Sequence, residues 1–128
     1  MIFEHFLGTD MCDDLESIEQ IMKKQNKNGV NEFWINIETP FPFMGVLTNK
    51  SFAYVHFFDE DGSPGFSALS DCNLGLDIEK TSIFYTNNSS EIIEVENECV
   101  LSIDKAIEIV KEFFNTKQIP KCIEWDEL

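Results

Sequence analysis

Apolar residues in the first quarter of the chain recur at helical spacing. They lie within residues 10–29 and would share one face of a helix: Met11, Leu15, Ile18, Ile21 and Met22. Thr9 or Asp10 is expected to cap the start of this helix, and Gly29 to stop it. Such a helix is stable mainly through packing of its apolar face, so it predicts another element beneath it.

A second stretch of helical periodicity covers residues 102–117. Ser102 is expected to cap it, with Asp104 in the first turn, where a carboxylate complements the helix dipole. Its apolar stripe has six members: Ile103, Ala106, Ile107, Val110, Phe113 and Phe114. Pro120 then prevents the helix from continuing, because proline lacks the necessary N–H.

Alternation of apolar and polar residues predicts the strands. In the segment NEFWINIE every second residue from Phe33 to Ile37 is apolar, and Pro40 ends the strand. Further strands are expected at about residues 43–48, 52–58, 65–70, 81–86 and 91–97, joined by turn segments such as TNKS, DEDGSPG and NNSS. Residues 52–58 are apolar on both faces, which is typical of a central strand covered on each side.

The chain ends in IPKCIEWDEL, which is either a frayed acidic tail or a last strand. As a strand over residues 121–127, Ile123 and Trp125 would point inward while the acids stay in water. The strand accounts for the pattern, whereas a frayed tail leaves both apolar residues unexplained.

The order of elements predicts an α+β fold. We expect a mainly antiparallel sheet of about six to seven strands with two principal helices packed on it, both on one face. Because no linker, repeat or low-complexity tract interrupts the chain, residues 1–128 are expected to form a single domain.

The charge balance narrows the choice of partners. The chain has 24 acidic residues against nine lysines and no arginine, which gives a net charge of −15. This balance argues against nucleic acid and against an anionic membrane as partners, because both attract basic surfaces. A basic protein is the natural partner, since opposite fields speed encounter. The alternative is that the acids only maintain solubility.

Cysteine usage and the N-terminus indicate a cytoplasmic protein with free thiols. The four cysteines, Cys12, Cys72, Cys99 and Cys122, have no metal-site spacing, and Cys12 and Cys122 fit small core positions. Glu4 replaces the basic start of a signal peptide, and no apolar run approaches a membrane helix in length. Nothing in the sequence calls for a cofactor or a metal ion.

No catalytic motif is present, and we expect no enzymatic activity. His56 lies in the most apolar strand and fits a satisfied core or edge histidine. Cys72 and His56 would form a nucleophile pair only if the fold brought them together. The segment Asp59-Glu60-Asp61-Gly62 fails the calcium-loop pattern, because Phe57 and Ala68 occupy ligand positions, so a hairpin turn is favoured.

The candidate binding residues are acids in two loops and two aromatic residues. The first loop carries Asp59, Glu60 and Asp61; the second carries Asp71, Asp77 and Glu79. The loops either join into one negative patch or are ordinary solvated loops. Phe66 and Trp34 are candidate apolar anchors, because aromatic residues are enriched at interaction hot spots. For Trp34, packing under a helix is the favoured alternative.

Several of these segments together resemble a known family. EFWINIE, DGSPGFSALSD, AIEIVKEFF and PKCIEWDEL make the chain similar to the first-numbered immunity family of bacterial polymorphic-toxin systems. The strongest likeness is C-terminal: a helix with Ala106 and Phe113, then Pro120, then a strand with Trp125. Lys117-Gln118 stands where that family often has a glycine turn.

The resemblance implies a stoichiometric inhibitor without catalysis. Such proteins protect the producing cell from a secreted toxin or from one delivered by contact-dependent growth inhibition, often a nuclease or deaminase. The expected partner is a basic toxin domain, bound by a monomer in a 1:1 complex. The alternative from the residues alone is an acidic adaptor or nucleic-acid mimic that binds another basic protein.

Overall fold

The structure, a computed structural model, describes residues 1–128. It contains two α-helices, α1 (Leu15–Met22) and α2 (Ile103–Thr116), and one 3-10 turn, η1 (Asn97–Cys99). Its strands are β1 (Ile2–His5), β2 (Gly8–Met11), β3 (Val30–Asn36), β4 (Phe43–Asn49), β5 (Phe52–Phe58), β6 (Phe66–Ala68), β7 (Thr81–Thr86), β8 (Glu91–Glu96), β9 (Leu101–Ser102) and β10 (Trp125–Glu127).

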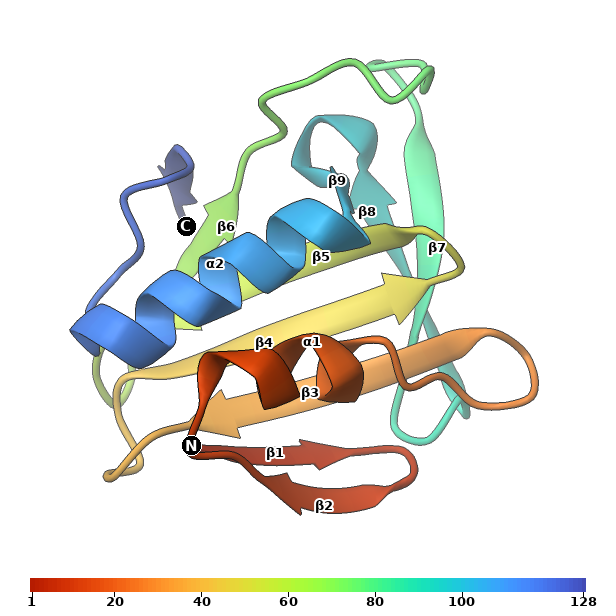
Figure 1. The fold of residues 1–128 in the computed structure, drawn as a ribbon. Helices are drawn as coiled ribbons and strands as arrows, with labels where there is room; N and C mark the ends of the chain where they lie inside the picture. The colour runs from red at the N-terminus through yellow and green to blue at the C-terminus, as the bar shows by residue number, and fades with distance from the viewer.

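Most strands form one antiparallel main sheet. Its order is β10-β6-β5-β4-β3-β1-β2, and β9 pairs with β5 outside this path. Figure 1 shows α1 and α2 side by side on one face of this sheet. The expected α+β fold is therefore confirmed, including two helices on one face.

The main core lies between the sheet and the helices. Because side chains alternate along a strand, the helix-facing positions of β3, β4 and β5 are the buried ones: Phe33, Ile35, Met44, Val46, Ala53, Val55 and Phe57. The helices contribute Ile18, Met22, Val110 and Phe113, among others. Phe57 and Phe113 meet edge to face, with ring centroids 5.7 Å apart.

The sequence predicts strands at 81–86 and 91–97, which correspond to β7 and β8, but it does not predict where they lie. β7 and β8 pair only with each other and form a separate two-stranded sheet. This hairpin crosses β3 and β4 on the side away from the helices (Figure 1). It builds a second core from six buried residues: Leu47, Tyr54, Phe84, Val95, Cys99 and Val100. The central strand β5 is thus covered on both faces around Tyr54, as its sequence predicts, whereas His56 and Phe58 lie beyond the hairpin and stay partly exposed.

The first helix begins later than its periodicity predicts. Residues 2–11 form the β1–β2 hairpin, so Thr9 and Asp10 lie in a strand and cap nothing. The N-cap is Asp14, whose side chain accepts a hydrogen bond from the Ser17 N–H at 2.8 Å. Met11, predicted to lie on the apolar helix face, is 78% exposed at the edge of the sheet.

The second helix matches its prediction closely. The Ser102 hydroxyl accepts a hydrogen bond from the Lys105 N–H at 3.1 Å, as expected of the N-cap. The helix ends at Lys117, which adopts the left-handed conformation at φ 58° where the resembling family often has glycine. Neither helix has the length and apolar character needed to cross a membrane.

The C-terminal strand is real but shorter than predicted. Only Trp125–Glu127 pairs with β6, while Ile123 is buried in the segment before it. Trp125 packs at the edge of the main core and donates its indole N–H to the Pro120 carbonyl at 2.8 Å. Asp126 and Glu127 are exposed, as the strand interpretation required.

The packing of the β7–β8 hairpin generates a stability prediction. Phe84 is fully buried between the hairpin and the sheet, so Phe84→Ala should lower the free energy of unfolding by about 3–5 kcal/mol. Ile92→Ala, on the outer face of the same hairpin where Ile92 is 61% exposed, should change it by less than about 0.5 kcal/mol. Urea unfolding of both variants checks this, and equal losses would contradict the packing described.

Candidate functional site

The face of the main sheet that turns away from α1 and α2 is only partly covered, and we call it the open face. One cross-strand row follows it from β1 to β10, through positions paired directly with one another: Glu4, Trp34, Gly45, His56, Ser67 and Asp126. Aligned residues in such a row are neighbours on the same face. The row therefore joins two exposed acids, at its ends, to a tryptophan and a histidine.

An aromatic surface occupies the uncovered half of the open face, and we define it as Trp34, Phe41, Phe43 and Phe58. Phe43 is at its centre, with ring centroids 4.6 Å from Phe58, 5.2 Å from Phe41 and 5.8 Å from Trp34. Trp34 is 45% exposed, and the three phenylalanines are half-buried. The favoured expectation that Trp34 packs under a helix is wrong, because both helices lie on the opposite face.

The β7–β8 hairpin covers the other half of the open face. Phe84 packs with Leu47 and Tyr54 there, and the Asn49 side chain donates a hydrogen bond to the Ile83 carbonyl at 2.9 Å. At its tip, the Asn87 N–H donates to a Glu32 carboxylate oxygen at 3.3 Å. The hairpin is thus fixed to the sheet at several points.

A groove runs along the line where the covered and uncovered halves meet. It has a volume of about 300 Å³ and is lined mainly by apolar and aromatic surface. Its residues are Glu32, Trp34, Gly45, Val46, Leu47, Tyr54, His56, Thr86 and Ile93. Gly45 allows the indole to lie across β4, since a Cβ there would stand 3.2 Å from the Trp34 ring.

Glu32 supplies the only carboxylate among the lining residues of the groove. Burial raises the pKa of Glu32, and the Asn87 N–H and the Trp34 indole offset part of that increase. Glu32 takes part in none of the seven ion pairs of the protein, which engage acids elsewhere. It is a partly desolvated acid without a cation.

His56 and Tyr54 line the groove together. The Tyr54 hydroxyl is hydrogen-bonded to the His56 Nε2, and it also contacts the Ser67 hydroxyl at 2.7 Å. Burial lowers the pKa of His56 to about 4, so the imidazole is neutral at pH 7. The expectation of a satisfied histidine in the sheet is confirmed.

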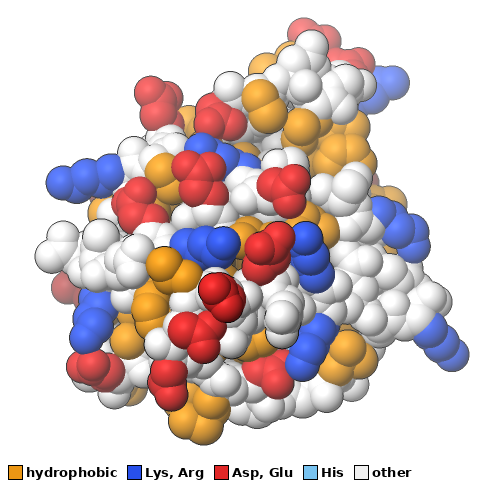
Figure 2. Space-filling model, in the orientation of Figure 1, with side chains coloured by type: hydrophobic (Ala, Val, Ile, Leu, Met, Phe, Trp, Pro, Cys, Tyr) orange, Lys and Arg blue, Asp and Glu red, His pale blue; other side chains and the backbone are white.

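Charge is distributed unevenly between the two sides of the protein. None of the nine lysines lies in a strand, and seven lie in α1, α2 or the segments that follow them. Figure 2 shows lysines interspersed with acids on the helix-covered side. On the open face of the main sheet the charged residues of the strands are all acids: Glu4, Glu32 and Asp126.

The first acidic loop begins beside the aromatic surface. Asp59, Glu60 and Asp61 follow Phe58 directly, are exposed and form no ion pair. They line a hollow of about 310 Å³ together with Glu127 of β10. Phe66 lines the same hollow but packs against the main core, which limits what it can offer to a partner.

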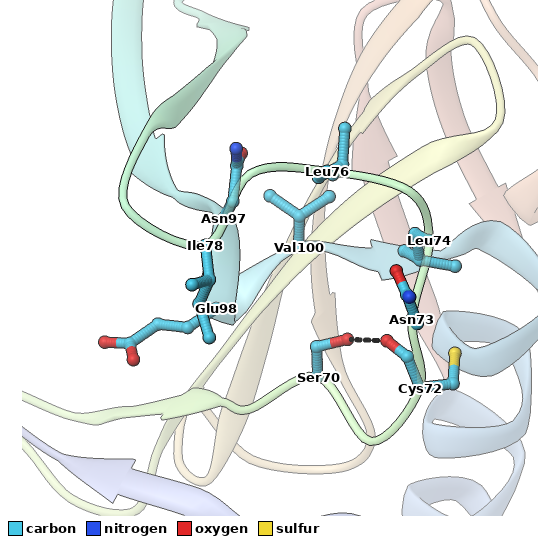
Figure 3. A pocket seen from close by; sticks show the side chains of 9 residues that line it. All are labelled: Ser70, Cys72, Asn73, Leu74, Leu76, Ile78, Asn97, Glu98 and Val100. Atoms are coloured by element: carbon cyan, nitrogen blue, oxygen red, sulfur yellow. Dashed lines mark hydrogen bonds between the residues drawn. The ribbon is translucent and has the colours of Figure 1, made fainter.

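The second acidic loop leaves the opposite end of β6, so separate loops are favoured over one joined patch (Figure 1). Asp71 is paired with Lys105 at 3.2 Å, and Asp77 accepts hydrogen bonds from its own loop and from Asn97. Glu79 is exposed. The loop covers a pocket of about 340 Å³, shown in Figure 3.

Cys72 and His56 are not brought together. Cys72 is exposed on the second acidic loop, where it lines the pocket of Figure 3, whereas His56 lies in the groove. Cys12 is buried as expected, and Cys122 is half-buried, where burial raises its pKa to about 11. No group of three or more metal-ligating side chains is arranged around a common point.

The groove was not predicted from the sequence. Glu32, Tyr54, Phe43 and Phe58 were not singled out, because each is unremarkable in its own strand. Their alternation places them on the side of Trp34, but only the strand register reveals that they are neighbours. Trp34 was the one candidate whose position in the sequence pointed toward this surface.

The burial of His56 predicts a pH-dependent stability. Its pKa is about 4 in the folded chain and about 6.5 when unfolded, so below about pH 6.5 the unfolded chain binds a proton that the folded chain does not. Lowering the pH from 7 to 5 should therefore reduce the free energy of unfolding more in the wild type than in His56→Gln. Urea unfolding at both pH values measures the difference, and equal changes would contradict a buried neutral imidazole.

Comparison with known proteins gives one end-to-end relationship. The chain is 27% identical over 129 residues to a protein of Burkholderia cenocepacia (strain H111) named double-stranded DNA deaminase immunity protein. The match covers 100% of this chain and 100% of that protein. No family model matches the chain.

Proposed function

We propose that this protein is an immunity protein that binds a bacterial toxin and neutralises it by occupancy. The observation that carries the proposal is its similarity, over the full length of both chains, to a double-stranded DNA deaminase immunity protein. A full-length match supports a shared binding role better than a match to one segment. Membership of the first-numbered immunity family stays a prediction.

The toxin is proposed to act on nucleic acid, with a deaminase of double-stranded DNA as the first candidate. An enzyme that acts on DNA needs a basic surface for the phosphates. A chain with a net charge of −15 and no lysine in any strand is electrostatically suited to such a surface. Bound there, it would compete with DNA, in the cytoplasm where that substrate lies.

Inhibition by occupancy predicts protection and a defined stoichiometry. Co-expression with the toxin domain encoded by the adjacent reading frame should restore growth of a sensitive bacterial host. In vitro, deamination of a duplex oligonucleotide should fall to background at a 1:1 molar ratio of the two proteins. Failure to protect at equal expression would refute the proposal, and complete inhibition far below one equivalent would indicate turnover instead.

The first acidic loop is proposed to steer the encounter. Exposed acids at the edge of an interface act mainly on the association rate. Replacing Asp59, Glu60 and Asp61 by serine should therefore slow association about tenfold at low salt and flatten its salt dependence.

A variant of equal charge change on the helix side provides the control. Asp13, Glu16 and Asp104 are exposed there, and their replacement by serine should slow association less. Stopped-flow association at several salt concentrations compares the two variants. Equal effects would show that only total charge matters and would remove the loop from the interface.

A further inference from the structure

The groove beside Trp34 has the composition of a seat for one cationic side chain. It combines a carboxylate, an exposed indole and a mainly apolar lining, and it contains no lysine. Its volume of about 300 Å³ lies at the bottom of the range for small-molecule pockets, which suits a long side chain better than a nucleotide or cofactor.

Glu32 gives the groove a carboxylate that is not paired with a cation. Several acids elsewhere in the protein form ion pairs with lysines, as in Lys117–Glu38 at 2.8 Å and Lys24–Asp10 at 2.8 Å. Glu32 instead has N–H donors and a second acid, Glu91, near it, while burial opposes its ionisation. His56 is the lining residue that could carry a positive charge, and it is neutral at pH 7. A cation that enters the groove therefore meets one uncompensated carboxylate.

Trp34 gives the groove an accessible aromatic face. Its ring stands against Gly45 and is 45% exposed, so one side of the indole is held by the sheet while the other is accessible. A guanidinium or ammonium group over the face of an indole is attracted by its π electrons, and the planar guanidinium of arginine also stacks parallel to the ring. The aromatic surface next to it offers the apolar contact that excludes water around such an anchor.

We propose that the toxin inserts an arginine or lysine side chain into this groove, where its charge pairs with Glu32 and its stem lies against Trp34. The inference rests on the proposed function and specifies which part of the protein the toxin touches. It assigns the open face, rather than the helix side, to the interface. It also separates two roles: the groove holds the complex together, while the acidic loop speeds its formation.

The test measures binding of the toxin domain from the adjacent reading frame to groove variants. Glu32→Gln removes the charge with little change in shape, and we expect the dissociation rate to rise about tenfold or more with little change in association. Trp34→Ala should weaken binding about thirtyfold or more, and Trp34→Phe should retain most of the affinity because it keeps an aromatic ring.

Matched controls lie away from the groove. Glu16→Gln makes the same charge change on α1, and Leu7→Ala removes an exposed apolar side chain in the β1–β2 turn; both should bind like the wild type. Thermal unfolding verifies that each variant is folded. If Trp34→Ala is not, Glu32→Gln and Trp34→Phe still decide the outcome.

A double-mutant cycle identifies the inserted residue. Each exposed arginine and lysine of the toxin is changed to alanine and measured against wild type and Glu32→Gln. One basic residue should cost about tenfold or more against the wild type and almost nothing against Glu32→Gln. If the wild type binds but no residue couples to Glu32, the groove proposal is overturned and the immunity function stands. If the wild type does not bind or protect, the immunity function itself fails.

Discussion

Packing of the β7–β8 hairpin across one half of the open face determines what the other half can do. Phe84 fixes the hairpin on Leu47 and Tyr54, and this packing places Thr86 and Ile93 of the hairpin along the groove. Without the hairpin, the open face would be a flat sheet surface with aromatic residues along one side. With the hairpin in place, a groove forms on this face, and the Glu32 carboxylate of β3 lies in it and accepts a hydrogen bond from the Asn87 N–H. The second core therefore shapes the candidate site as well as stabilising the fold.

The uneven distribution of charge makes the open face more acidic than the helix-covered side. The lysines gather on the helix side, where several pair with neighbouring acids, so the excess of carboxylates is least compensated along the strands. Self-repulsion among so many acids costs stability. A chain can tolerate this cost when its acids are spread over exposed edges and loops, as Asp59, Glu60 and Asp126 are. Acids placed in this way would attract a basic partner at long range, whereas contacts of Trp34 with the proposed partner would form only after docking.

Long-range charge and short-range aromatic contacts together suit a protein that must capture a toxin quickly and release it slowly. Long-range attraction raises the rate of encounter, and a few desolvated anchors determine how long the complex lasts. Neither kind of interaction requires a catalytic group, and Cys72 and His56 lie apart in the fold. The relationship to a double-stranded DNA deaminase immunity protein is in keeping with this division, since DNA-binding enzymes present the basic surfaces that such a field attracts.

The sequence by itself determined the elements whose signals are local. Hydrophobic periodicity and the Ser102 cap placed α2 correctly, and alternation between turn segments placed β4, β5 and β7, because these patterns depend on residues a few positions apart. The net charge of −15, from which a basic partner is predicted, is a property of composition and does not depend on the fold. The tertiary structure decided what depends on distant contacts. It drew residues 2–11 into a hairpin that displaced the predicted start of α1, sent β7–β8 out of the main sheet, and left Trp34 exposed beside Glu32. Strand register and the crossing of the hairpin bring these residues together, and neither is encoded in the spacing along any one segment.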